Sequence, residues 1–304
     1  MKMKKFIAVL SVVGMVAAMA AGCGGNSDSK SSADASGSAS DWDSSTDITI
    51  VSREDGSGTR GAFIELFGVE EKNDAGEKVD MTTEEAQITN STSVMLTTVA
   101  GDEYAIGYVS LGSLDDSVKA VKIDGAEATA DNIKSGDYKV SRPFNVATKK
   151  GQDNEVAKDF LNFILSKEGQ DVVSEEGYIA QDDAQAFEGT QPSGKLVVGG
   201  SSSVSPVMEK LIEAYKAVNP NADIELQTTD STTGMTSTID GSYDIGMASR
   251  ELKDEEAAEL DSTVIATDGI AVIVNNANPT DELTSDQVKA IYTGDALTWD
   301  EVVK

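Results

Sequence analysis

The sequence at residues 52–59 is Ser52-Arg53-Glu54-Asp55-Gly56-Ser57-Gly58-Thr59, directly after the β-branched run Ile48 to Val51. The run predicts a strand. Apolar residues at helical spacing then predict a helix over residues 61–67. A strand that passes through a glycine-rich turn into a helix is the repeating unit of α/β proteins. The turn also puts small residues and hydroxyls at a helix start, where backbone N–H groups favour anions.

The same alternation continues along the chain and predicts an α/β fold. Strands are expected around 106–109, 142–147, 195–198, 223–226, 243–247 and 270–274, and a strand region over 97–109. Helices are expected over 155–165, 167–173, 206–218, 232–239 and 285–292. The turn-rich, apolar-poor residues 188–194 separate two such series. With 304 residues in total, the chain is long enough for two lobes.

Two further helix starts carry hydroxyls and small residues. One is the stretch from Gly200 to Pro206, with four serines, in which Pro206 suits the first helical position. The other runs from Asp230 to Gly234. Every helix needs a cap, so a single start of this kind is weak evidence of an anion site. Three of them in one chain strengthen that interpretation.

The arginines strengthen it further. The chain has four, namely Arg53, Arg60, Arg142 and Arg250. Arg53 and Arg60 flank the glycine-rich turn, and a planar guanidinium there indicates oxyanion binding. The alternatives are that Arg60 is a surface helix residue and that Arg250 is an ion-pair partner of Glu251.

Composition excludes several other functions. The net charge of -29 repels nucleic acid. The chain has no His, which removes the usual acid/base group at neutral pH and the commonest zinc ligand. Cys23 is the only cysteine, so no intramolecular disulfide can form.

The first residues predict export. Three lysines precede an apolar run over 6–21, which has the form of a secretory signal over residues 1–22. The sequence Ala20-Ala21-Gly22-Cys23 resembles a bacterial lipobox, in which the cysteine is diacylated. The alternative is a chance cysteine after an ordinary signal peptide. The Ser-, Gly- and Asp-rich residues 23–46 are then expected to be a flexible tether between a lipid anchor and the body.

Taken together, these stretches resemble the phosphate-binding lipoproteins of bacterial phosphate ABC transporters, the PstS family. The resemblance rests on the segments already quoted and on 105–109, 141–145, 244–250 and 266–275. It implies a type II periplasmic-binding-protein fold with two α/β lobes and two hinge strands. It also implies a monomer without cofactor or metal that binds inorganic phosphate between the lobes and passes it to permease subunits, without enzymatic activity.

Family residues transfer to this chain by position. From one lobe the resemblance implies Ser203, Val204, Ser205 and Ser231 as donors, and from the other Arg53, Ser57, Gly58 and Thr59, with Asp55 orienting the guanidinium. The assignment within Ser201 to Ser205 is open by one or two positions. Ser249 stands where some members have an Asp that accepts the phosphate proton. Asp230 is the nearest substitute in sequence, with helix capping as its alternative role, and Arg250 is a supporting residue.

The order of the parts differs from the family pattern. Joining Lys304 to Ile48 would restore it, so the chain reads as a circular permutation, with a truncated tandem duplication or an assembly artefact as alternatives. Residues 47–140 plus 277–304 would form one lobe and 141–276 the other. A receptor for sulfate, molybdate or tungstate, a phosphatase-like enzyme and an adhesin of the same fold remain functional alternatives.

Overall fold

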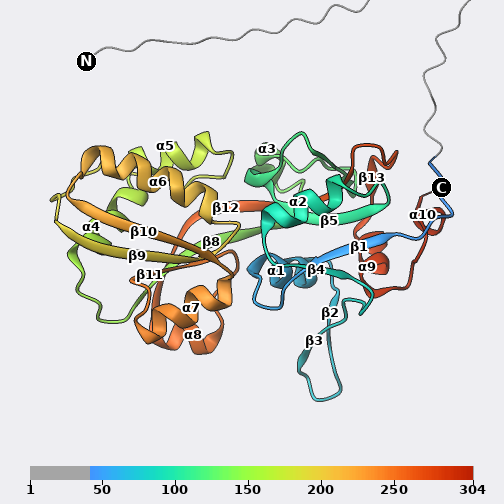
Figure 1. Ribbon diagram of the computed structural model, residues 1–304, viewed down its shortest axis with the longest axis horizontal. Helices are drawn as coiled ribbons and strands as arrows, with labels where there is room; N and C mark the ends of the chain where they lie inside the picture. The colour runs from blue at the N-terminus through green and yellow to red at the C-terminus, as the bar shows by residue number, and fades with distance from the viewer. Residues whose placement is uncertain (1–41, 304) are drawn as a thin grey trace, which may run out of the picture. The chain divides into compact units, whose positions relative to one another are not determined.

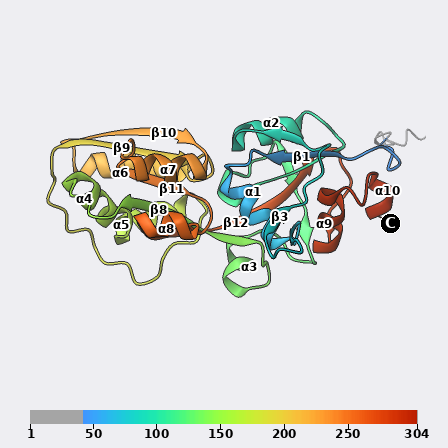
Figure 2. The same ribbon diagram turned by 90° about the horizontal axis from the view of Figure 1, so that it is seen from below.

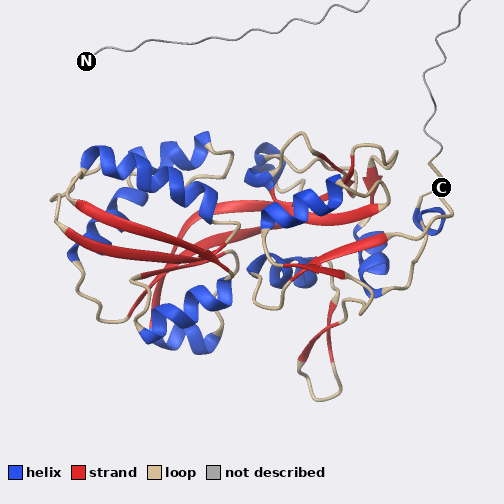
Figure 3. Ribbon diagram, in the orientation of Figure 1, coloured by secondary structure: helices blue, strands red, loops and turns tan. Residues whose placement is uncertain are grey.

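The computed structural model describes residues 42–303, which form a mixed sheet with helices on both faces (Figures 1 and 3). The predicted signal sequence and Cys23 lie outside the described residues. The strands are β1 (Thr49–Arg53), β2 (Glu70–Lys72), β3 (Lys78–Asp80), β4 (Gln87–Thr89), β5 (Ala105–Ser110), β6 (Val118–Ala120), β7 (Lys122–Ile123), β8 (Ser141–Lys149), β9 (Gly194–Ser201), β10 (Ala222–Thr229), β11 (Ile245–Ala248), β12 (Leu260–Asn275) and β13 (Glu282–Leu283). The helices are α1 (Gly58–Leu66), α2 (Thr92–Ala100), α3 (Ala130–Ser135), α4 (Glu155–Ile164), α5 (Lys167–Glu175), α6 (Ser205–Val218), α7 (Ser231–Asp240), α8 (Asp254–Glu259), α9 (Ser285–Thr293) and α10 (Trp299–Val302), with one 3-10 turn, η1 (Leu111–Ser113).

The main sheet has parallel strands at both ends and two long antiparallel strands in its middle. Its order is β10-β9-β11-β8-β12-β5-β1-β4, and β6 pairs with β12. β1 is parallel to β4 and β5, and β9 is parallel to β10 and β11. β8 and β12 pair antiparallel with each other and with the neighbouring groups. Parallel strands end at the same edge of a sheet. The helices that follow the strands of one parallel group therefore begin close together.

Two separate hydrophobic cores form on this sheet. The first contains Phe63 and Tyr108 with the second half of β12, and the second contains Phe160, Tyr215 and the residues Ile265 and Ala266 of β12. Smaller clusters cover the opposite faces, where α2 packs on β5 and α7 packs on β11. The architecture is therefore two-lobed, as predicted, and Figure 2 shows β8 and β12 running between the lobes.

Strand β12 differs from its predicted place. The sequence predicts a strand over 270–274 and a lobe boundary at 276, but β12 spans Leu260–Asn275 and its side chains enter both cores. The first half of the strand is interrupted by the polar residues 261–263 and 267–268, so only its continuous apolar half is recognisable as buried strand.

Helix α2 also differs from the prediction. Residues 97–100, predicted as part of a strand region, end this helix, and β5 begins only at Ala105. Thr97 and Thr98 are β-branched residues that usually favour strands. Here their hydroxyls donate to the carbonyl oxygens of Ser93 and Val94, at 2.9 and 2.8 Å. Burial of Met95 and Val99 in the core then outweighs the local preference.

Residues 42–46 pack on the body although the predicted tether includes them. The Trp42 ring lies 5.8 Å from that of Tyr104 and 5.9 Å from that of Trp299. The Asp300 N–H donates to the Ser44 oxygen at 2.8 Å, and the Ile48 N–H donates to the Leu297 oxygen at 2.7 Å. The start of β1 therefore lies beside residues 297–300.

Candidate functional site

Four helices begin at one place in the structure, two from each lobe. α1 and α2 follow β1 and β4, and α6 and α7 follow β9 and β10. Ser57, Ser91 and Asp230 cap three of them by accepting a backbone N–H in the first turn. Pro206 lies in the first turn of α6. The first N–H groups of a helix have no partner within it and carry the positive end of its dipole, so this meeting point favours an anion.

Buried hydroxyls from all four helix starts touch one another there. Thr59 Oγ1 lies 2.8 Å from Ser203 Oγ, and Thr92 Oγ1 lies 3.2 Å from the same atom. On the other side, Ser201 Oγ donates to Ser249 Oγ at 2.9 Å, and Ser231 Oγ lies 3.4 Å from Ser249 Oγ. A hydroxyl can rotate to donate or to accept, so these groups can turn their hydrogens toward an oxyanion.

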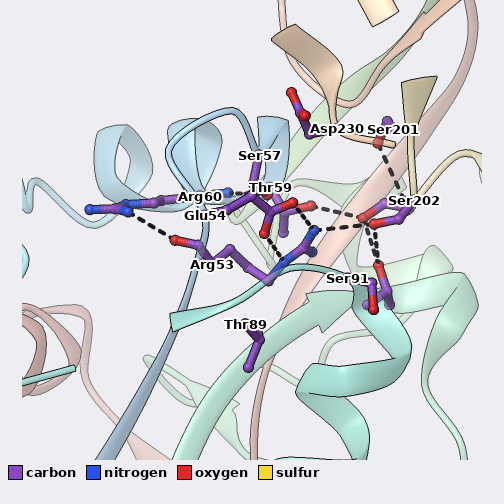
Figure 4. Close-up of polar contacts among 12 residues, drawn as sticks. Arg53, Glu54, Ser57, Thr59, Arg60, Thr89, Ser91, Ser201, Ser202 and Asp230 are labelled. Carbon is purple, nitrogen blue, oxygen red and sulfur yellow. Dashed lines mark hydrogen bonds and ion pairs between the residues drawn. The ribbon is translucent and has the colours of Figure 1, made fainter. Parts of the chain in front are cut away.

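Arg53 supplies the positive charge of the cluster. Its side chain is 2% exposed, and its Nη2 lies 3.1 Å from Ser202 Oγ of the opposite lobe (Figure 4). Its Nε and Nη2 both donate to the Glu54 carboxylate at 2.8 Å. Glu54 therefore orients the guanidinium in this structure.

The role predicted for Asp55, to orient the Arg53 guanidinium, is filled by Glu54. Asp55 is 97% exposed and its Oδ1 accepts from Arg60 Nη1 at 2.7 Å. Arg60 itself is 14% exposed and holds two carboxylates, so it is not a plain surface helix residue. The two acidic residues follow Arg53 directly, and only the direction of the chain as it leaves β1 decides which one reaches the guanidinium.

The backbone of Arg53 is held by side chains. β1 pairs with β4 as far as Arg53 but with β5 only at Thr49 and Ile50. Beyond that point the Arg53 N–H donates to the Tyr108 hydroxyl at 3.2 Å, and the Arg53 carbonyl accepts from Arg60 Nη1 at 2.9 Å. Burial raises the pKa of Tyr108 to about 12, so this phenol stays protonated at neutral pH and also pairs with Ser52 Oγ at 2.9 Å.

Two glycines allow the lobes to meet. A Cβ at Gly56 would collide with the Asp230 carboxylate, and a Cβ at Gly58 would collide with the hydroxyls of Ser231 and Ser249. The Thr232 N–H donates across the same contact to the Gly56 carbonyl at 3.2 Å. The backbone of the glycine-rich turn is therefore in direct contact with the start of α7, which explains why small residues occur in this turn.

The remaining predicted residues have defined positions around the cluster. Asp230 caps α7, and its two oxygens accept from the N–H and hydroxyl of Thr233 at 2.8 and 2.6 Å. The Val204 N–H donates to the Ser201 carbonyl at 3.0 Å, and the Ser205 hydroxyl donates to the same oxygen at 3.2 Å. Ser202 and Ser203 are thus the hydroxyls of this turn that contact Arg53, Thr59 and Thr92. The Ser205 hydroxyl instead contacts the Ser201 carbonyl and the Thr228 hydroxyl of β10.

Arg250 is an ion-pair partner, as in the alternative considered above, but with a different residue. Its Nη1 and Nη2 donate to the Glu256 carboxylate at 2.7 and 2.8 Å, whereas Glu251 offers only its backbone oxygen. Arg250 Nη2 also lies 3.3 Å from the hydroxyl of Thr232, next to the contact between the lobes.

Sequence reasoning missed Thr92, Glu54 and Tyr108. Thr92 belongs to the polar stretch 90–93 after β4, which has the same form as the other helix starts, but the following β-branched residues hid the helix. Glu54 and Tyr108 carry no local signal, since their roles depend on side-chain direction and on strand pairing.

Neutral donors and one guanidinium suit a small tetrahedral oxyanion. Among residues 42–303 no group of three or more His, Cys, Asp or Glu side chains could hold a metal ion. In the same range no helix is both long and apolar enough to cross a membrane.

The chain is similar to known proteins along almost its whole length. A family model described as a PBP superfamily domain matches residues 21–168 and 185–303. The chain is 55% identical over 306 residues, covering 100% of both chains, to the phosphate-binding protein PstS 2 of Streptococcus agalactiae serotype V. It is 42% identical over 303 residues, covering 99% of this chain and 100% of the relative, to PstS 2 of Streptococcus pneumoniae serotype 4.

A solved structure has the same fold. The crystal structure of a phosphate-binding protein of a phosphate ABC transporter from Streptococcus pneumoniae TIGR4 matches with a TM-score of 0.67 and 43% identity. The match covers 84% of this chain and 100% of that one. The chain therefore belongs to the PBP superfamily and, within it, to the PstS family of phosphate-binding proteins.

Proposed function

We propose that this protein binds inorganic phosphate at the meeting point of α1, α2, α6 and α7 and delivers it to the permease subunits of an ABC transporter. The observation that carries the proposal is the buried Arg53 guanidinium surrounded by hydroxyls from both lobes. The similarity to phosphate-binding proteins of two streptococci, one of them with a solved structure, supports phosphate as the ligand.

Calorimetric titration of the purified protein tests this function. Phosphate should bind with one site per chain, and sulfate, molybdate and tungstate should bind more weakly under the same conditions. Tighter binding of one of these anions would assign the site to that oxyanion instead.

We infer that the protein is a carrier and not an enzyme. The chain lacks His, and its site residues are hydroxyls and one arginine without a paired acid and base. Incubation with a phosphomonoester should release no phosphate above the rate in buffer. Release that disappears in an Arg53→Ala variant would contradict this part of the proposal.

The protein is further proposed to act outside the cytoplasmic membrane as a monomer held by a lipid on Cys23. The signal-like residues 1–22 and the small residues before Cys23 support this. Cys23→Ser should release the protein into the medium and leave phosphate binding intact, because anchoring and binding use different parts of the chain. Unchanged membrane association of the variant would contradict the anchor.

We also propose that the permuted order of parts is the working order of this protein. The end-to-end match with the S. agalactiae relative supports this over a truncated duplication or an assembly artefact. The contact between residues 44–48 and 297–300 supports it as well, since permutation requires the rejoined ends to lie close together.

A further inference from the structure

Arg60 connects the site to a hairpin that lies outside it. The hairpin consists of β2 and β3, which pair antiparallel and extend away from the main sheet (Figure 1). Arg60 Nε donates to Asp80 Oδ2 at the end of β3 at 2.8 Å. Its Nη1 donates to the Arg53 carbonyl at 2.9 Å and to Asp55 at 2.7 Å. One guanidinium thus joins the hairpin to the strand end that carries the anion-binding arginine.

Asp80 is itself fixed in direction. Its Oδ1 accepts the N–H and the hydroxyl of Thr82, at 2.8 and 2.5 Å, which leaves Oδ2 for Arg60. The carboxylate is 27% exposed and the guanidinium 14% exposed. An ion pair that is partly shielded from water and holds a second hydrogen bond is more strongly oriented than a surface pair.

The carbonyl that Arg60 holds belongs to Arg53, so a change in the Arg60 position moves the base of the Arg53 side chain. The other fixed points of Arg53 are its N–H on Tyr108 and its guanidinium on Glu54 and Ser202. Without Arg60, the Arg53 carbonyl would lose the one side-chain hydrogen-bond donor that it has among the described residues. A shift of the guanidinium then weakens its geometry toward a bound oxyanion.

We propose that Arg60 is a positioning residue of the anion site and that Asp80, through Arg60, makes the β2–β3 hairpin part of that site. The proposal rests on the proposed binding of phosphate. Neither residue needs to touch the ligand: Asp80 sets the direction of Arg60, and Arg60 sets the backbone of Arg53. Substitutions of Asp80 that leave the fold intact should therefore change phosphate affinity, whereas hairpin residues that do not contact Arg60 should have no effect.

The test is a double-mutant cycle on phosphate affinity, measured by calorimetry on the full chain. Asp80→Asn keeps the bonds to Thr82 and weakens the pair with Arg60, and we expect it to reduce affinity roughly threefold to tenfold. Arg60→Gln should reduce affinity about tenfold, and the double variant should be no weaker than Arg60→Gln alone. The melting temperature without ligand should stay close to that of the wild type in each case.

Two controls separate positioning from other causes. Glu71→Gln removes the 2.8 Å ion pair between Lys289 and Glu71 of the same hairpin. Because this ion pair does not contact the site, the variant should leave phosphate affinity unchanged. Arg60→Lys keeps the positive charge but cannot span both Asp80 and the Arg53 carbonyl, so it should remain weaker than the wild type. Full wild-type affinity in Arg60→Lys would show that only charge matters and would overturn the proposal.

Other outcomes are equally decisive. Unchanged affinity in Asp80→Asn, or additive losses in the double variant, would also overturn the proposal while leaving phosphate binding established. Absence of phosphate binding by the wild-type chain would instead overturn the proposed function, and this inference with it.

Discussion

Arg53 is fixed at its N–H, at its carbonyl and along its guanidinium, each time by a different neighbour. A charged side chain with this many partners keeps one direction before the ligand arrives, so binding does not have to order it. Glu54 neutralises its charge in a bidentate pair. The site therefore offers an oriented set of donors with little net charge, in a protein whose net charge is -29.

Arg53→Ala tests this residue directly. The substitution removes the charged donor and leaves the Glu54 carboxylate without its partner beside the anion. We expect phosphate affinity to fall on the order of a hundredfold or more, measured by calorimetry. Arg60→Ala should have a clearly smaller effect, and adding Glu54→Gln to Arg53→Ala should restore part of the loss. Equal losses for the two arginines would mean that Arg53 is not the main charged ligand.

Tyr108→Phe tests the hydrogen bonds at the end of β1. The variant keeps the ring, which stacks on Phe63 at 3.9 Å between centroids, but removes the acceptor of the buried Arg53 N–H. The free energy of unfolding should fall by about 1–3 kcal/mol, the usual effect of an unsatisfied buried donor. Urea denaturation measures it. Tyr104→Phe is the matched control, because within residues 42–303 the Tyr104 hydroxyl meets only an exposed N–H, that of Asp43. This variant should change stability little.

At the scale of elements, the start of α8 carries a pH-dependent contact. Burial by itself raises the pKa of Glu256, but the hydrogen bonds from the Arg250 guanidinium and the Lys253 N–H, with both positive charges, lower it below the ordinary 4.5. A carboxyl whose pKa is lowered by folding stabilises the native state above its unfolded pKa, and this is lost as the pH falls through the folded pKa.

The melting temperature should therefore decrease as the pH drops below 4.5. The melting temperature of Glu256→Gln should decrease less steeply than that of the wild type over this range. Differential scanning calorimetry at several pH values measures both melting temperatures. Their difference removes the contribution of the other carboxylates, because these are the same in the two proteins. Parallel curves for the two proteins would show that the pair between Arg250 and Glu256 does not contribute to acid sensitivity.

The elements that the sequence predicts well are those with local signals. β1 with α1, and β9 with α6, combine a β-branched strand with a small-residue turn and an amphipathic helix, and each is confirmed to within a few residues. α2 and the first half of β12 were missed because tertiary packing and strand pairing decide them. The site follows the same rule: hydroxyls at helix starts could be recognised, whereas the choice of Glu54 over Asp55 depends on side-chain direction.

At the scale of the whole molecule, the contact between residues 44–48 and 297–300 bears on the order of the parts. A rearranged chain of residues 195–304 followed by 47–190 should fold and bind phosphate within a few-fold of this chain. The two arrangements share all contacts except those of residues 42–46 and 191–194. They otherwise differ in loop closure, which varies slowly with loop length. Circular dichroism and calorimetry measure both properties.

A chain opened within β12 is the matched control, because this strand enters both cores, and it should not fold. Failure of the rejoined chain to fold, with the present order stable, would show that the connection between 190 and 195 is needed for more than closing a loop.

The four helix starts at the site come from both lobes, so the site exists only while both lobes are folded. A bound anion therefore links the unfolding of one lobe to that of the other. At a free concentration of a thousand times its dissociation constant, a ligand adds about 4 kcal/mol to the free energy of unfolding. In the bound state the two lobes should melt as one cooperative unit, and the loaded carrier should resist proteolysis longer than the empty one.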